Sequence, residues 1–201
     1  MLDFITAHPF GALVTGSAEH ELFATHLPLL LDRTRGVHGV LQGHIARANS
    51  HHARLSDASP DALVLFTGPD AYVSPSFYPA KQRHGKVVPT WNYIAVHVYG
   101  KLRFVDDRDF MMQHLDALTD QHEGSQPHPW AMHDAPQDFL EQLVKSTVGL
   151  EIEITRLEGK WKLSQNRSSE DIDGVIDGLA QSSSAHERDI AAQVHAHRPQ
   201  R

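Results

Sequence analysis

The sequence contains no cysteine. This absence excludes disulfides, thiolate nucleophiles, iron–sulfur clusters and cysteine-based zinc sites, and it fits a reducing compartment. Long apolar runs are absent too. No stretch approaches the roughly 20 residues that a membrane helix requires, and the first residues lack the basic start of a signal peptide. We therefore expect a cytoplasmic protein with no membrane association.

Several common catalytic motifs are also missing. The sequence has no GxxxxGK[ST], GxGxxG, HExxH or GxSxG pattern, so nucleotide hydrolysis, dinucleotide binding, zinc peptidase and esterase chemistry lack their usual signals. The histidine pairs at His51–His52 and at His195 and His197 have no carboxylate cluster beside them, and we interpret them as surface residues. We expect no metal, and the sequence assigns no catalytic residue.

The chain has 201 residues, is 40% hydrophobic and carries a formal net charge of -7. This length suits one domain, which we expect over residues 1–180. Residues 181–201 are rich in Ser, Ala, His and Gln, so we expect a flexible C-terminal tail. The acidic balance repels polyanions, and nonspecific DNA binding would need a local basic patch.

Apolar extended runs recur along the chain and predict a mainly β protein with peripheral helices, an α+β fold. The runs cover residues 10–15, 22–31, 37–45, 62–66, 93–99 and 148–154. Helical periodicity follows at residues 107–122, after Pro136 with Phe139, Leu140, Leu143 and Val144, and after a capping signal at Ser168. We expect the first two of these helices to face the core, and residues 68–70 to end the strand at 62–66.

Three polar segments at strand boundaries suggest one site. They are KWKLSQNR (160–167), VVPTWNY (87–93) and GHIARAN (43–49). Lys and Arg can neutralise a phosphate, and a tryptophan can cover a flat ring. The alternative for residues 160–167 is a solvated turn, and for Trp91 and Trp161 it is a place in the core.

Other polar residues join the candidate site with their own alternatives. His44 and Arg47 end a strand where a helix is predicted to begin, so a phosphate could be held by Arg47 and by exposed backbone amides. Lys81 could supply a second cation or be a solvated loop residue. His26 lies in an apolar run, where a hydrogen-bonded, partly buried imidazole is the plain interpretation.

Taken in order, five segments resemble the PaiB-type family of FMN-binding transcriptional regulators: residues 24–28, 43–49, 68–76, 88–93 and 159–166. The resemblance implies an FMN-binding split β-barrel, related to pyridoxamine-phosphate oxidases, that forms a homodimer with FMN at the subunit interface. It also implies negative regulation of transcription, with DNA as a possible partner. Phe77 stands where the family usually has Trp.

By this resemblance, the strand and turn that carry His44, Arg47 and Asn49 face the FMN phosphate and ribityl chain. Trp91, Asn92 and residues 161–165 close around the ring or the phosphate. The candidate cofactor-binding residues are His26, His44, Arg47, Asn49, Lys81, Thr90, Trp91, Asn92, Lys160, Trp161, Lys162 and Gln165. Two other functions stay open. One is a flavin-dependent oxidoreductase, in which FMN carries the redox chemistry. The other is a barrel that has lost flavin and binds protein.

Overall fold

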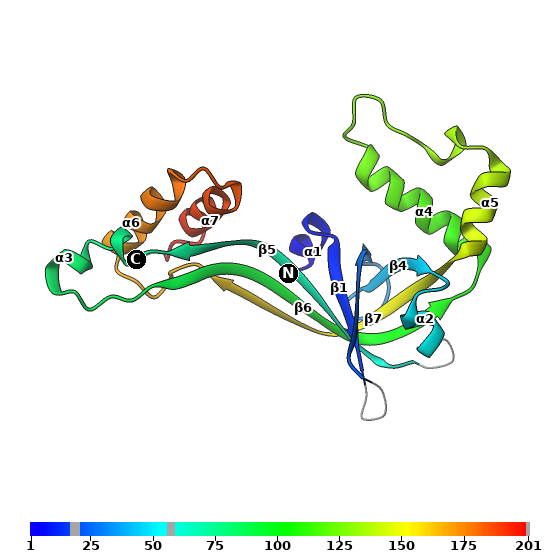
Figure 1. The fold of residues 1–201 in the computed structure, drawn as a ribbon, viewed down its shortest axis with the longest axis horizontal. Helices are drawn as coiled ribbons and strands as arrows, with labels where there is room; N and C mark the ends of the chain where they lie inside the picture. Colours follow the sequence, from blue (N-terminus) through cyan, green and yellow to red (C-terminus); the bar gives the residue numbers. More distant parts are fainter. Residues whose placement is uncertain (17–20, 56–58, 200–201) are drawn as a thin grey trace. The chain divides into compact units, whose positions relative to one another are not determined.

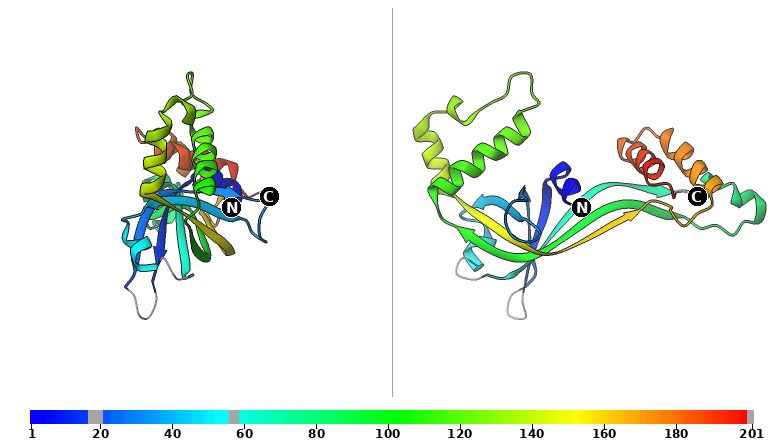
Figure 2. Two further views of the ribbon diagram at one scale, coloured as in Figure 1. Left: turned by 90° about the vertical axis from the view of Figure 1, so that its right-hand side faces the viewer. Right: turned by 180° about the vertical axis from the view of Figure 1, so that it is seen from behind.

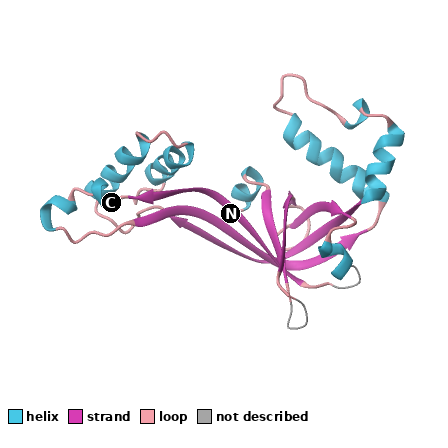
Figure 3. Ribbon diagram, in the orientation of Figure 1, coloured by secondary structure: helices cyan, strands magenta, loops and turns pink. Residues whose placement is uncertain are grey.

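The structure is a computed structural model that describes residues 1–16, 21–55 and 59–199 (Figure 1). Seven strands form one sheet in the order β2-β1-β5-β6-β7-β4-β3. The strands are β1 (Phe10–Thr15), β2 (Phe23–Pro28), β3 (Leu30–Asp32), β4 (Val40–Ala46), β5 (Asp61–Val73), β6 (Thr90–Val105) and β7 (Thr147–Lys162). The predicted mainly β architecture with helices around it is confirmed (Figure 3).

The helices lie before, between and after the strands in sequence. They are α1 (Leu2–Ala7), α2 (Ser50–Leu55), the 3-10 helix η1 (Pro75–Phe77), α3 (Ala80–His84), α4 (Arg108–Glu123), the 3-10 helix η2 (Met132–Asp134), α5 (Gln137–Ser146), α6 (Ser169–Ala180) and α7 (Ala185–Ala196). In the described part of the chain, none of them combines the length and apolar character needed to cross a bilayer.

The strand order and the chain connection together require the sheet to curl. β2 and β3 stand at opposite edges of the sheet, yet only Leu29 separates them in sequence. Because consecutive Cα atoms are about 3.8 Å apart, the two edges must meet at this residue. Leu29 is buried, and its N–H donates to the Pro9 carbonyl at 2.9 Å. The sheet therefore wraps into a barrel whose interior is the core.

The chain divides into two compact units. The first unit comprises residues 1–66 and 97–158, and the second comprises residues 67–96 and 159–201. In the first unit the barrel core contains Leu13, Leu41, Val64, Val98 and Leu150, all essentially inaccessible to solvent. α4 packs on β7 at Gly149, where an added Cβ would collide with the ring of Phe110.

The second unit contains about half of β5 and of β6, the end of β7, and the helices η1, α3, α6 and α7. Of these, α6 and α7 lie on the same side of the strands (Figures 1 and 2). α6 buries an apolar stripe of Ile172, Val175 and Leu179. Its glycines allow close packing, because a Cβ at Gly174 would overlap the carbonyl oxygen of Phe77. Local sequence and packing therefore agree along α6.

Four expectations require correction. The single domain over residues 1–180 is instead divided between two compact units. The tail contains α7, whose Ile190 and Val194 are buried, so the segment belongs to the folded second unit. β5 continues through residues 68–70 to Val73. The apolar stripe of α5 does not face the core, because Phe139 and Leu143 are exposed and only Val144 is buried.

Candidate functional site

The start of β6 and the end of β7 bring two of the three predicted segments together inside the second unit. Lys162 Nζ donates a hydrogen bond to Thr90 Oγ1 at 2.7 Å. Asn92 Nδ2 donates to Ser164 Oγ at 3.0 Å, and both side chains are buried. Neighbouring strands thus fix a lysine ammonium group at a defined position, which a mobile surface lysine would not achieve.

Gln165 closes the turn that follows β7. Its Nε2 donates to the carbonyl oxygen of Trp161 at 2.6 Å, and its Oε1 accepts from the N–H of Leu163 at 2.8 Å. Ser164 has a φ of 61°, a left-handed conformation that non-glycine residues rarely adopt and that surrounding contacts must hold. The bonds of Asn92 and Gln165 supply that restraint, so these two residues position the segment.

Aromatic side chains flank this polar segment in different environments. Trp91 is 53% exposed and meets the exposed Tyr72 ring edge to face, with centroids 5.9 Å apart. Trp161 is half-buried. Trp91 and Tyr72 therefore present aromatic surface to solvent, and the alternative of a core tryptophan does not hold for Trp91. Sequence reasoning missed Tyr72, although it lies within the 68–76 segment.

Three other described cations of the second unit lie outside the Thr90 and Lys162 pair. Lys81, in α3, donates from Nζ to Ser76 Oγ at 3.2 Å, and Lys160 is exposed on β7. Arg167 lies over the ring of Tyr78, with its guanidinium carbon 4.8 Å from the ring centroid. Burial raises the pKa of the Tyr78 hydroxyl.

In the first unit, Asn49 organises a partly buried polar cluster with Thr25 and His51. Asn49 Oδ1 accepts from the backbone N–H of His51 at 2.8 Å, and Thr25 Oγ1 lies 2.7 Å from His51 Nδ1. His51 is fully buried, and burial lowers its pKa. The interpretation of His51 as a surface residue is wrong. His26, by contrast, is exposed and stacks on Phe10 with ring centroids 6.2 Å apart.

His44 pairs with a histidine that the sequence did not indicate. His44 Nδ1 lies 3.1 Å from Nε2 of His114 on α4, and the His114 ring is parallel to Phe110 at 6.0 Å. Burial lowers the pKa of His114 to about 4, with a further contribution from the charge of His44. Both rings are therefore neutral at pH 7, and the pair attaches α4 to β4.

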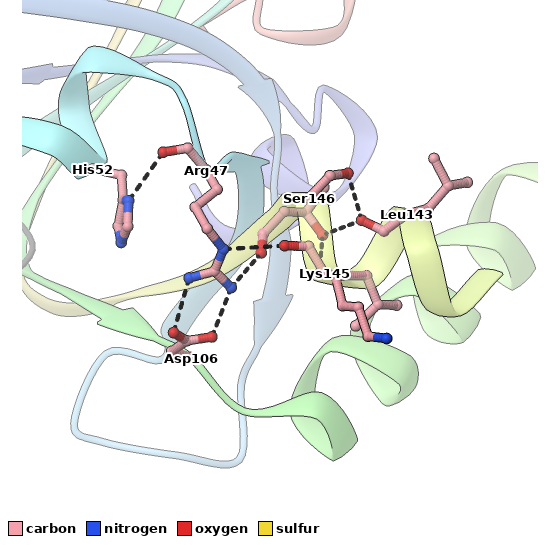
Figure 4. A network of polar contacts seen from close by, with 8 residues as sticks. Arg47, His52, Asp106, Leu143, Lys145 and Ser146 are labelled. Atoms are coloured by element: carbon pink, nitrogen blue, oxygen red, sulfur yellow. Dashed lines mark hydrogen bonds and ion pairs between the residues drawn. The ribbon is translucent and has the colours of Figure 1, made fainter. Parts of the chain in front are cut away.

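Arg47 forms a clamp at the end of β4 (Figure 4). Its guanidinium donates to both carboxylate oxygens of Asp106, at 2.8 and 2.7 Å. It also donates to the carbonyl of Lys145 at 3.2 Å and to that of Thr147 at 2.9 Å. Carbonyls at a helix end lack partners within the helix, so Arg47 completes the C-terminal turn of α5.

The clamp limits what else Arg47 can bind. A guanidinium has five N–H donors, and four of them are used by Asp106, Lys145 and Thr147. The hydrogen bonds from Arg47 lower the pKa of Asp106, so this pair stays charged at neutral pH. A hollow of about 300 Å³ lies beside the clamp. Arg47 would have one N–H left to donate to a phosphate bound here, unless Asp106 moved away.

Glu151 is a second buried group that sequence reasoning missed. Its side chain is nearly inaccessible and accepts from Arg35 Nη1 at 2.5 Å, from Gln42 at 2.9 Å and from Arg103. Burial alone would raise its pKa, but the hydrogen bonds of Arg35 and Gln42 and the charge of Arg103 hold it at about 2. The network joins β4, β6 and β7 of the barrel wall, and we interpret it as structural.

Comparison with known proteins decides the family. Residues 1–156 match the family described as "Putative FMN-binding domain". The Bacillus subtilis protein named Protease synthase and sporulation protein PAI 2 is 33% identical over 189 residues, which cover 94% of this chain and 87% of that protein. The chain belongs to the PaiB-type FMN-binding family. Its cofactor, as the sequence predicted, is FMN.

Two other proteins are similar to this chain. The Emericella nidulans protein named Uncharacterized protein AN0679 is 38% identical in an alignment that covers 87% of this chain and 83% of that protein. Among solved structures, the FAD and heme binding protein from Mycobacterium smegmatis superposes with a TM-score of 0.54 at 16% identity, over 85% of this chain and 74% of that one. At that identity the likeness concerns the fold, and the predicted split-barrel architecture is confirmed.

The donor groups of the second unit suit FMN. The flavin needs cations or N–H donors for its phosphate and a flat apolar surface for its ring. Lys162 is fixed by Thr90, and Trp91 and Tyr72 offer exposed aromatic faces. When bound, FMN supplies electron and hydride transfer.

Proposed function

We propose that this chain is a homodimeric FMN-binding protein that regulates transcription negatively, with the flavin held by the second unit. The proposal is based mainly on Lys162, whose ammonium group donates to Thr90 Oγ1 at 2.7 Å. Thr90 immediately precedes the exposed Trp91. Lys162 and Lys160 provide charge for the phosphate, and Trp91 provides a face for the ring. Asn92 and Gln165 act as positioning residues, because their bonds fix the turn around Ser164.

Regulation through a change in the dimer fits the charge distribution better than extensive contact with a DNA backbone. Most arginines in the described part of the chain already pair with carboxylates, which leaves few cations for phosphates. The paired arginines are Arg33, Arg35, Arg47, Arg83, Arg103, Arg108, Arg156 and Arg198. FMN occupancy or redox state would bias a dimer conformation that DNA or another protein reads.

FMN titration of three variants, Lys162→Met, Lys101→Met and Arg47→Met, tests where the phosphate binds. Lys162→Met should weaken FMN binding about tenfold, or ~1.4 kcal/mol, because a charge-assisted contact to the phosphate is lost. Lys101→Met removes a cation of the first unit that pairs with Asp61 and should leave the affinity unchanged. Quenching of flavin fluorescence on binding provides the measurement, and circular dichroism checks folding.

Arg47→Met separates the two phosphate assignments. The clamp predicts that this variant loses stability through the freed carbonyls of Lys145 and Thr147 while it retains FMN affinity. If Arg47→Met weakens FMN binding and Lys162→Met does not, the phosphate belongs to the first unit and the second-unit assignment is wrong.

The purified holoprotein also distinguishes the regulator from the oxidoreductase. A salt-sensitive, sequence-selective mobility shift on DNA, altered by FMN reduction, is the expected result if the dimer reads DNA directly. Turnover with NAD(P)H, seen as bleaching of the flavin absorbance, would favour the enzyme. Gel filtration of wild-type protein tests the dimer, since a monomer at all concentrations contradicts it.

A further inference from the structure

One segment accounts for the whole net charge of the chain. Residues 106–146 contain nine carboxylates and two cations, a net charge of -7, and the remaining residues balance with sixteen of each sign. The carboxylates are Asp106, Asp107, Asp109, Asp116, Asp120, Glu123, Asp134, Asp138 and Glu141. Because the field of clustered charges adds, this segment attracts cations and repels anions.

The same segment exposes apolar side chains. On α5, Phe139 is 52% and Leu143 is 44% exposed, and Trp130 is exposed in the loop before it. Between α4, η2 and α5 lies a hollow of about 690 Å³ with Met112, Met132 and Leu140 among its lining residues. Polar groups at the hollow include Asp116, Gln113, His133 and Gln137. Apolar patches edged by polar residues mark interaction sites, and methionine adapts to varied partners.

We propose that the surface formed by α4, η2 and α5, here called the acidic hairpin, docks a basic amphipathic helical segment of another protein. A helix that places apolar side chains along one face would enter the hollow and cover Phe139 and Leu143. Its lysines and arginines would meet Asp116, which lines the hollow, and Asp138 in the first turn of α5, both of which are exposed. Charge steers such an encounter, and apolar contact holds it.

Charge also argues against the other occupants of this surface. In a symmetric dimer made through the acidic hairpin, the same patch would face itself and bring two charges of -7 together. Nucleic acid and anionic lipid would be repelled for the same reason. A small organic cation could enter the hollow but would leave the stripe of Phe139 and Leu143 exposed. The proposal does not depend on where FMN binds.

Fluorescence anisotropy with the full chain and three labelled peptides provides the test. The first peptide has about four helical turns of Lys with Leu at positions i, i+3, i+4 and i+7. The second has the same composition with the stripe scrambled, and the third has Glu in place of Lys. We expect saturable binding of the first, at least about tenfold weaker binding of the others, and weakening as salt rises.

Paired variants locate the binding. Phe139→Gln with Leu143→Gln removes apolar contact, and Asp116→Asn with Asp138→Asn removes charge, so each pair should weaken binding about tenfold. Val37→Gln, at a residue 90% exposed, and Asp189→Asn, on α7, are the matched controls and should have no effect. Circular dichroism and thermal unfolding check that all four proteins fold.

Three results would overturn the proposal. The first is no saturable binding of the basic amphipathic peptide. The second is equal binding by wild type and both paired variants. The third is an oligomer of the wild type that the Phe139→Gln, Leu143→Gln variant loses, which would assign the surface to a second copy of the chain.

Discussion

α5 and α6 have similar amphipathic sequences, but the apolar stripe of α6 is buried and two of the apolar side chains of α5 are exposed. Each has an apolar stripe at helical spacing, yet Leu179 of α6 is 1% exposed and Leu143 of α5 is 44% exposed. α6 packs against α7 and, through Gly174, against Phe77. α5 is attached near its C-terminal end by Val144 and the Arg47 clamp. Periodicity therefore shows which face of a helix avoids water, but not whether the chain itself supplies the cover.

Truncation of the two leucines should give the largest contrast. Leu179→Ala leaves a cavity in a closed interior and should cost about 2–5 kcal/mol. Leu143→Ala removes a side chain that is already partly solvated and should cost less than about 1 kcal/mol. Urea unfolding followed by circular dichroism gives both values. An equally large loss for Leu143→Ala would mean that α5 is covered in solution, so the contrast between the helices would fail.

Acid should loosen α4 before it affects α6, because the attachments of the two helices differ chemically. His114 has a folded pKa of about 4 against 6.5 in an unfolded chain. The unfolded state therefore takes up more protons as pH falls from 6.5 to 4, and up to about 3 kcal/mol of stability is lost in that window. Glu151 adds a further loss between about 4.5 and 2.

Hydrogen exchange at pH 7 and pH 5 measures this difference. The amides of α4 should exchange faster at pH 5 relative to those of α6, after correction for intrinsic rates. His114→Met keeps an apolar side chain against Phe110 and removes the titration, so its stability should depend less on pH between 6.5 and 4. A wild-type α4 that stays as protected as α6 at pH 5 would contradict the role of this histidine pair.

Local patterns in the sequence predicted local structure well. The run at residues 10–15 became β1, and the capping signal at Ser168 is realised, since its side chain accepts from the N–H of Asp171. α7 was missed because its buried Ile190 and Val194 stand among polar residues, and their burial depends on contact with α6.

For the site as well, the sequence predicted local features but not contacts between residues distant in sequence. The polar segments at strand ends predicted that Thr90 and Lys162 lie close together. The two residues are in contact because β6 and β7 are neighbours in the sheet. The partners of Arg47 could not be inferred, since Asp106 and Lys145 lie 59 and 98 positions away in sequence. The sequence alone does not distinguish an arginine that binds a ligand from one that attaches a helix end to a strand.

The smallest expected difference between the two helices concerns the side chains that cap their N-terminal ends. Asp107 Oδ1 accepts from the N–H of Phe110 at 2.7 Å at the start of α4, and Ser168 accepts from Asp171 at 3.3 Å at the start of α6. Replacement of either residue by Ala should cost about 1 kcal/mol, because an N-cap bond depends only on its own helix turn. Asp107→Asn keeps the bond and removes one charge from an acidic segment, so it should be nearly neutral. Thermal unfolding of the three variants would sharpen the comparison: if Asp107→Ala costs several times more than Ser168→Ala, α4 depends on its first turn because the acidic hairpin lacks the cover that α6 receives.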